Sequence, residues 1–66
     1  MRIFINDDEF QFSGNTINDM LAEYGFNGSA GIALAVNETV VLKNTWATYE
    51  LRENDSILLI TPAQGG

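Results

Sequence analysis

Two short apolar runs lie at opposite ends of this 66-residue chain, at residues 3–5 (Ile-Phe-Ile) and 57–60 (Ile-Leu-Leu-Ile). Runs without a polar residue at every second position are typical of central strands that are covered on both faces. A chain of this length has room for one domain, so both runs belong to one sheet. We therefore expect the first and last strands to pair in parallel at the centre of that sheet.

Two further patterns predict β-hairpins. Residues 2–6 would place Ile3 and Ile5 on one side of a strand and Phe4 on the other, and Phe10 and Phe12 alternate with a polar residue in residues 10–12. Between these segments, Asp7 and Asp8 are typical turn residues. Residues 32–36 alternate between larger and smaller side chains, and a second turn at Asn37 and Glu38 leads into another strand at residues 39–43. Residues 44–49 predict a turn or a single helical turn before the last strand.

One helix is expected between the hairpins. Thr16 is a suitable N-cap, and Asp19 stands at the position from which its side chain can complete a capping box. Gly25 can end the helix with a positive φ. The apolar residues of this segment have helical spacing: Ile17, Met20, Leu21 and Tyr24.

This order of elements predicts an α+β fold, a β-grasp (ubiquitin-like) roll. Its mixed sheet would have about four to five strands, with one main helix on one face. We expect a domain over residues 1–62 and a flexible tail over residues 63–66 that ends in Gly-Gly. Trp46 stands alone among polar residues, either in the core or in contact with a partner.

The composition excludes several classes of function. The chain has no histidine and no cysteine, so it has no imidazole base, thiolate nucleophile or disulfide. It is also too short to enclose a substrate cavity. We expect no enzyme activity of its own, no catalytic residues, no metal site and no stably bound cofactor. The acidic residues Asp7, Asp8 and Glu9 are interpreted as a solvated turn, because they lack the ligand spacing of a calcium loop.

The charge and hydropathy of the chain indicate protein partners. Nine acidic and three basic residues give a net charge of −6, which disfavours binding to nucleic acid and to anionic membranes. No apolar stretch is long enough to span a bilayer, and we expect no signal peptide, because Asp7 follows the short apolar start. We expect a cytoplasmic protein.

The end of the chain offers a different kind of chemistry. Gly65 and Gly66 have no side chains, so a narrow active site of another protein can admit the terminal carboxylate, with Gln64 entering behind it. Attack of this carboxylate on the α-phosphate of ATP would give an acyl-adenylate, which a sulfur or amine nucleophile can displace. The alternative is a frayed end without function.

Several segments together carry a family resemblance: Leu34-Ala35-Val36-Asn37, Val40-Val41, Trp46, Leu51, Asn54-Asp55-Ser56-Ile57 and the final Gly65-Gly66. Through these segments, which are spread over the whole chain, the sequence resembles the ThiS family, the ubiquitin-like sulfur carriers of thiamin biosynthesis. Two positions depart from the family pattern. Leu42 stands where proline is common, and Asn54 stands where the turn often has glycine, although asparagine also tolerates a left-handed backbone.

The resemblance implies a sulfur-carrying role for Gly66. A ubiquitin-activator-like (ThiF-like) adenylyltransferase would use ATP to adenylate Gly66, and a sulfur donor such as a cysteine desulfurase would allow its conversion to a thiocarboxylate. A ThiG-like thiazole synthase would then consume the sulfur. The alternatives are the small subunit of molybdopterin synthase, a ubiquitin-like protein modifier, and an acidic interaction domain whose tail has no role.

A docking surface is also expected. One helix can cover only one face of the sheet, yet the central strands carry apolar side chains on both. We therefore predict that the face away from the helix, with Phe4, Leu58 and Ile60, contacts partner proteins.

Overall fold

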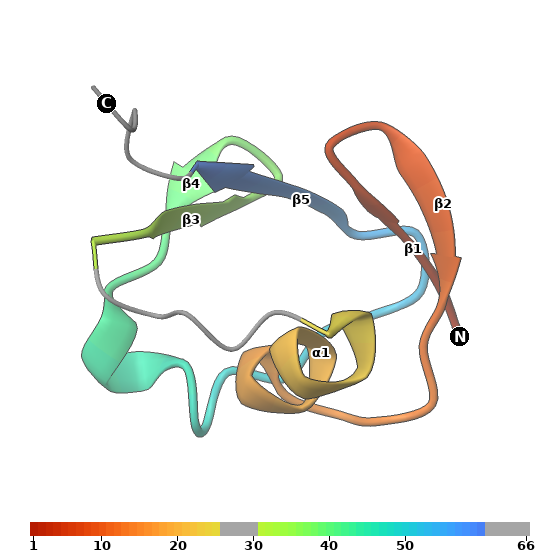
Figure 1. Ribbon diagram of the computed structural model, residues 1–66, viewed down its shortest axis with the longest axis horizontal. Coiled ribbons are helices and arrows are strands. Elements are labelled where there is room, and N and C mark those ends of the chain that lie inside the picture. The colour runs from red at the N-terminus through yellow and green to blue at the C-terminus, as the bar shows by residue number, and fades with distance from the viewer. Residues whose placement is uncertain (26–30, 61–66) are drawn as a thin grey trace.

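The computed structural model describes residues 1–25 and 31–60. The strands form one sheet in the order β2-β1-β5-β3-β4 (Figure 1). Strands β1 and β5 pair in parallel at its centre, and the other neighbours are antiparallel. The elements are β1 (Arg2–Ile5), β2 (Asp8–Gln11), α1 (Ile17–Tyr24), β3 (Ala33–Val36), β4 (Thr39–Val40), a 3-10 turn η1 (Lys43–Thr45) and β5 (Ser56–Ile60). The predicted α+β architecture and parallel central pair are confirmed.

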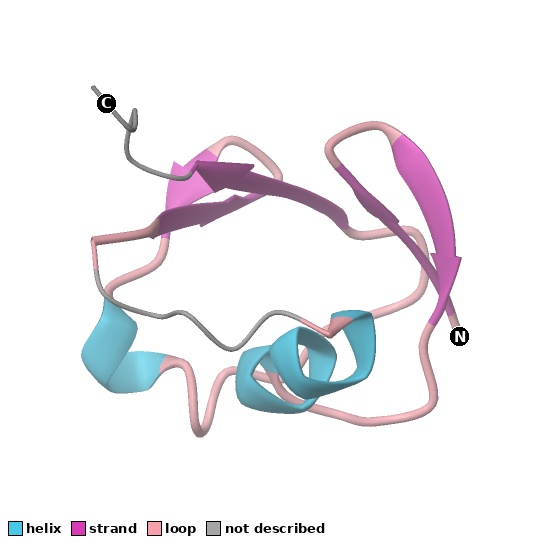
Figure 2. Ribbon diagram, viewed as in Figure 1, coloured by secondary structure: helices cyan, strands magenta, loops and turns pink. Residues whose placement is uncertain are grey.

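The molecule has two layers, with the strands on one side and the helical segments on the other (Figure 2). Ile3 and Ile5 of β1 and Ile57 and Leu59 of β5 point between the layers, where all four are buried. They do so because alternate residues of a strand face the same side of the sheet. Helix α1 contributes Ile17, Met20 and Leu21 to this core. Residues at opposite ends of the sequence therefore share one core.

Both ends of α1 are capped as the sequence predicts. The backbone N–H of Asp19 donates to Thr16 Oγ1 at 3.2 Å, and Asp19 Oδ2 accepts from the N–H groups of Thr16 and Asn15, each at 3.1 Å. These backbone hydrogen bonds favour the carboxylate form and lower the pKa of Asp19. Gly25 ends the helix with a φ of 90°.

Three local features differ from expectation. The first hairpin turns at Asn6 and Asp7, with φ values of 50° and 73°, so Asp8 belongs to β2 instead of the turn. Strand β4 is only two residues long instead of five. Tyr24, at the last position of the helix, is 41% exposed and contacts Phe10 edge-on.

Trp46 belongs to the core. Its side chain is buried, and its Nε1–H donates to the carbonyl oxygen of Val41 at 2.9 Å. This satisfies the polar atom of the indole, as a buried tryptophan requires. Asn54 has a φ of 70°, so it adopts the left-handed backbone expected at this turn.

Candidate functional site

The sheet face opposite α1 carries exposed apolar side chains. Leu58 is 51% exposed and Ile60 is 47% exposed, whereas Phe4 is half-buried. The expectation that the central strands are covered on both faces is therefore wrong for β5 within the described residues. The physical reason is that the helical segments α1 and η1 both lie on the other side of the sheet (Figure 2).

The strand register places the three predicted docking residues on the same face. Phe4 pairs with Ser56, two residues before Leu58, and alternate residues of β5 share one side. The structure thus brings Phe4, Leu58 and Ile60 together where the sequence places them. Their role in docking remains a prediction.

One member of this face was missed by sequence reasoning. Val40 is 67% exposed, and its partner Ala35 also pairs with Leu58. Val40 and Leu58 therefore flank Ala35 on the same side of the sheet. The sequence predicts the second hairpin, but it does not indicate that β3 pairs with β5, and this pairing is what brings Val40 near Leu58. We call Phe4, Val40, Leu58 and Ile60 the apolar face.

Charged groups border the apolar face on the β1–β2 side. Glu9 pairs directly with Phe4 across the two strands, so its side chain lies on the same face. The guanidinium of Arg2 lies over the Phe4 ring, with its Cζ atom 5.6 Å from the ring centroid. This cation–π contact helps to hold Phe4 in place. The apolar face therefore has a polar border at β2. Leu58 and Ile60 lie on β5, which is separated from β2 by β1.

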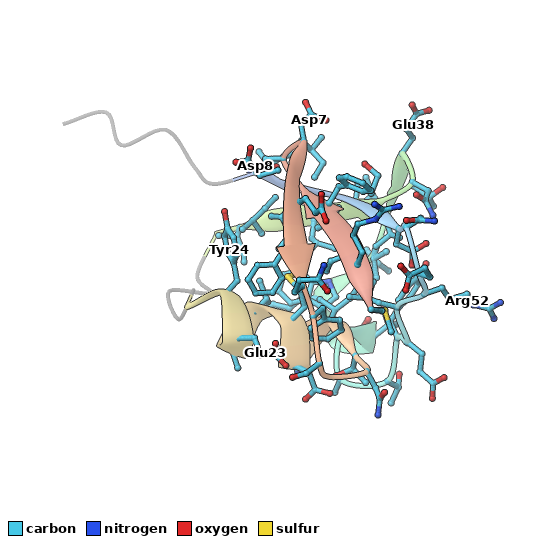
Figure 3. The ribbon with its side chains drawn as sticks, turned by 90° about the vertical axis from the view of Figure 1, so that its right-hand side faces the viewer. Asp7, Asp8, Glu23, Tyr24, Glu38 and Arg52 are labelled. Carbon is cyan, nitrogen blue, oxygen red and sulfur yellow. The ribbon has the colours of Figure 1, made fainter. Side chains whose placement is uncertain are left out.

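The hairpin tips carry further carboxylates. Asp7 and Asp8 at one tip and Glu38 at the other are exposed and point away from the body of the protein (Figure 3). Asp7 follows Asn6, whose side chain contacts the backbone of Leu59 near the end of β5. Negative charge therefore lies near the carboxyl end of β5. Within residues 1–25 and 31–60, no acidic group is arranged with two others to hold a metal ion.

The described part of the chain stops at the end of β5. Ile60 is its last residue, so Gln64, Gly65 and Gly66 lie outside the described residues. Their predicted role in activation stays a prediction. No pocket was found in the structure over the residues it describes, so the apolar face is an open surface there.

None of the described helices has the length and apolar character that would be needed to cross a membrane.

Comparisons with known proteins give a consistent match over the whole chain. The model of the ThiS family matches residues 1–66. The sulfur carrier protein ThiS of Escherichia coli (strain K12) is 34% identical over 67 residues and is covered completely, as is this chain. The uncharacterized protein ycf40 of Trieres chinensis is 35% identical over 65 residues, which cover 96% of this chain and 86% of that protein.

A solved structure shares the fold. The crystal structure of the thiamine biosynthesis protein (ThiS) from Geobacter metallireducens superposes with a TM-score of 0.83 over 100% of both chains, at 13% sequence identity. At this identity the match concerns the fold alone. It agrees with the β-grasp architecture predicted from the order of the elements.

Proposed function

This chain belongs to the ThiS family, and from that premise we propose that it is a sulfur carrier protein of thiamin biosynthesis. The observation that carries the proposal is the full-length match to a family of sulfur carriers, in a chain that ends in Gly-Gly and has no cysteine to hold sulfur. We assign Gly66 as the residue that is loaded.

The proposed chemistry takes place on the terminal carboxylate. An oxygen atom of the Gly66 carboxylate attacks the α-phosphorus of ATP, and pyrophosphate leaves. The terminal sulfur of a persulfide then attacks the acyl carbon, and AMP leaves with the electron pair of the broken C–O bond. A thiol next cleaves the S–S bond, so that both electrons remain on the acyl-bound sulfur as a thiocarboxylate and the thiol becomes a disulfide.

All catalytic groups in this scheme belong to partner enzymes. We propose a ThiF-like adenylyltransferase that binds the ATP, a persulfide source such as a cysteine desulfurase, and a ThiG-like thiazole synthase that consumes the sulfur. We also propose a cytoplasmic location for this chain, where it would meet these enzymes. The chain itself acts as a co-substrate and holds no cofactor.

The apolar face is the proposed docking surface for the adenylyltransferase. Ile60 lies on this face and directly precedes residues 61–66. Six residues reach at most about 20 Å when extended. An enzyme that contacts Leu58 and Ile60 therefore has its active site within that distance of them.

Charge favours a particular kind of partner surface. Glu9 shares the apolar face with Phe4, Asp7 and Asp8 lie at the adjacent hairpin tip, and the chain has a net charge of −6. A partner with an apolar patch and a basic border would be complementary to this arrangement. Opposite charges of this kind accelerate association mainly at low salt.

The pathway is tested by offering the loaded protein two acceptors. We expect thiocarboxylate-bearing protein to bind thiazole synthase and to lose its sulfur during thiazole formation, as followed by intact mass. The matched comparison uses the large subunit of molybdopterin synthase under the same conditions. A stable complex with that subunit and none with thiazole synthase would move the protein to the molybdopterin pathway.

A further inference from the structure

Two asparagine side chains hold opposite ends of β5. Each is the first residue of a hairpin turn and has a left-handed backbone, Asn6 with a φ of 50° and Asn37 with a φ of 51°. Asn6 Oδ1 accepts from the N–H of Leu59 at 2.8 Å, and Asn6 Nδ2 donates to the Leu59 carbonyl at 3.3 Å. Asn37 Oδ1 accepts from the N–H of Ser56 at 3.0 Å, at the start of the strand.

The contact made by Asn6 continues the pairing of β1 with β5. The last backbone hydrogen bond between these strands runs from the N–H of Asn6 to the carbonyl of Ile57, at 2.9 Å. Beyond it β1 turns away into the hairpin. A carboxamide has one carbonyl acceptor and an N–H donor, as a peptide group does. The Asn6 side chain thereby supplies the next partner for β5, and the partly buried N–H and C=O of Leu59 are satisfied.

This contact lies close to the reactive end of the chain. Leu59 is followed by Ile60 and then by residues 61–66, whereas Ser56 lies at the far end of β5. On the β1 side, the side-chain hydrogen bonds of Asn6 reach β5 near its carboxyl end. Resting on the proposed function, we propose that Asn6 is a positioning residue, which fixes the point and direction from which the C-terminal segment enters the adenylating active site.

The proposal predicts an effect on catalysis instead of on docking. Leu58 and Ile60 pair with Ala35 and Ala33 of β3, and this pairing does not involve the Asn6 side chain. The apolar face therefore keeps its residues, and KM should change little. A carboxylate delivered from a less restrained strand end reaches the reactive geometry less often, so kcat should fall.

The variants Asn6→Gly and Asn37→Gly form a matched pair. Both positions have a positive φ, which glycine adopts without strain. N6G loses the side-chain hydrogen bonds to Leu59, and N37G loses those to the N–H of Ser56 and to Asp55 Oδ1. In a pyrophosphate-release assay with the adenylyltransferase, we expect N6G to lower kcat about tenfold or more, since small misplacements far from the chemistry carry costs of this size. N37G should leave kcat near that of the wild type. Amide hydrogen exchange at Leu59 should accelerate in N6G only.

The possible outcomes separate the two proposals. Equal kcat values for N6G and N37G, or unchanged exchange at Leu59 in N6G, would overturn the role of Asn6. If N6G does not fold, Asn6→Asp serves instead, because it keeps the acceptor for the Leu59 N–H but replaces the donor with an oxygen atom; unchanged kcat in N6D would equally overturn the role. No pyrophosphate release from the wild type would contradict the proposed function instead, and the Leu59 exchange rate would still decide whether Asn6 holds β5.

Discussion

Removal of Gly66 will lower the rate of adenylation by at least about a hundredfold, because the terminal carboxylate is then withdrawn from the α-phosphate of ATP by the length of one residue. That length is about 3.5 Å in an extended chain. The shortened chain still ends in a glycine carboxylate, Gly65, so its chemical reactivity is unchanged. The lower rate of adenylation would therefore reflect only the position of the terminal carboxylate.

Pyrophosphate release with the adenylyltransferase and ATP measures this effect. A chain extended by one glycine is the matched control, since it keeps the composition of the end but misplaces the carboxylate in the opposite direction, and it should also react slowly. Urea unfolding should give the same stability for all three proteins, because residues 1–25 and 31–60 form the described core without Gly66. A shortened chain that is adenylated at the wild-type rate would exclude Gly66 as the loaded residue.

Replacement of Ile60 by glutamate will raise the KM of the adenylyltransferase for this protein about tenfold to a hundredfold, the range expected for an apolar residue at the centre of an interface. Ile60 is 47% exposed on the apolar face, so a carboxylate there meets water in the free protein. In the complex it would be buried against the partner without a counter-charge. The free energy of unfolding should change by only about 0.5 kcal/mol, as is usual for surface substitutions.

A variant with the same added charge at a different place provides the control. Ala22 is exposed on α1, in the other layer of the molecule, and Ala22→Glu adds one carboxylate there. If docking uses the apolar face, A22E should have a KM close to that of the wild type. Equal KM values for the wild type and I60E would place the docking surface elsewhere.

The fold could be predicted because its determinants are local patterns. The unbroken runs at residues 3–5 and 57–60 identify the central strands, and Thr16 with Asp19 identifies the start of the helix. Each signal depends on residues within a few positions of one another. A chain of this size has few ways to pack one helix on one sheet, so the local patterns determine the architecture.

The parts of the site that escaped prediction depend on long-range register. Val40 joins the apolar face only because β3 lies between β4 and β5. The amide of Asn6 meets Leu59 across 53 positions of sequence, and nothing near Asn6 indicates that partner. The position of the first turn is ambiguous for a different, local reason: two adjacent aspartates and the pair Asn-Asp are both good turn formers, and the turn lies at Asn6 and Asp7.

The central claim is that Gly66 carries sulfur, and the most direct measurement is the intact mass of the protein after incubation with the adenylyltransferase, ATP, a persulfide donor and a thiol. The account predicts a species in which one oxygen atom of the terminal carboxylate is replaced by sulfur, which forms only when ATP is present and not when Gly66 has been removed. An unchanged mass, under conditions in which the same enzymes load another ThiS-family protein, would contradict it.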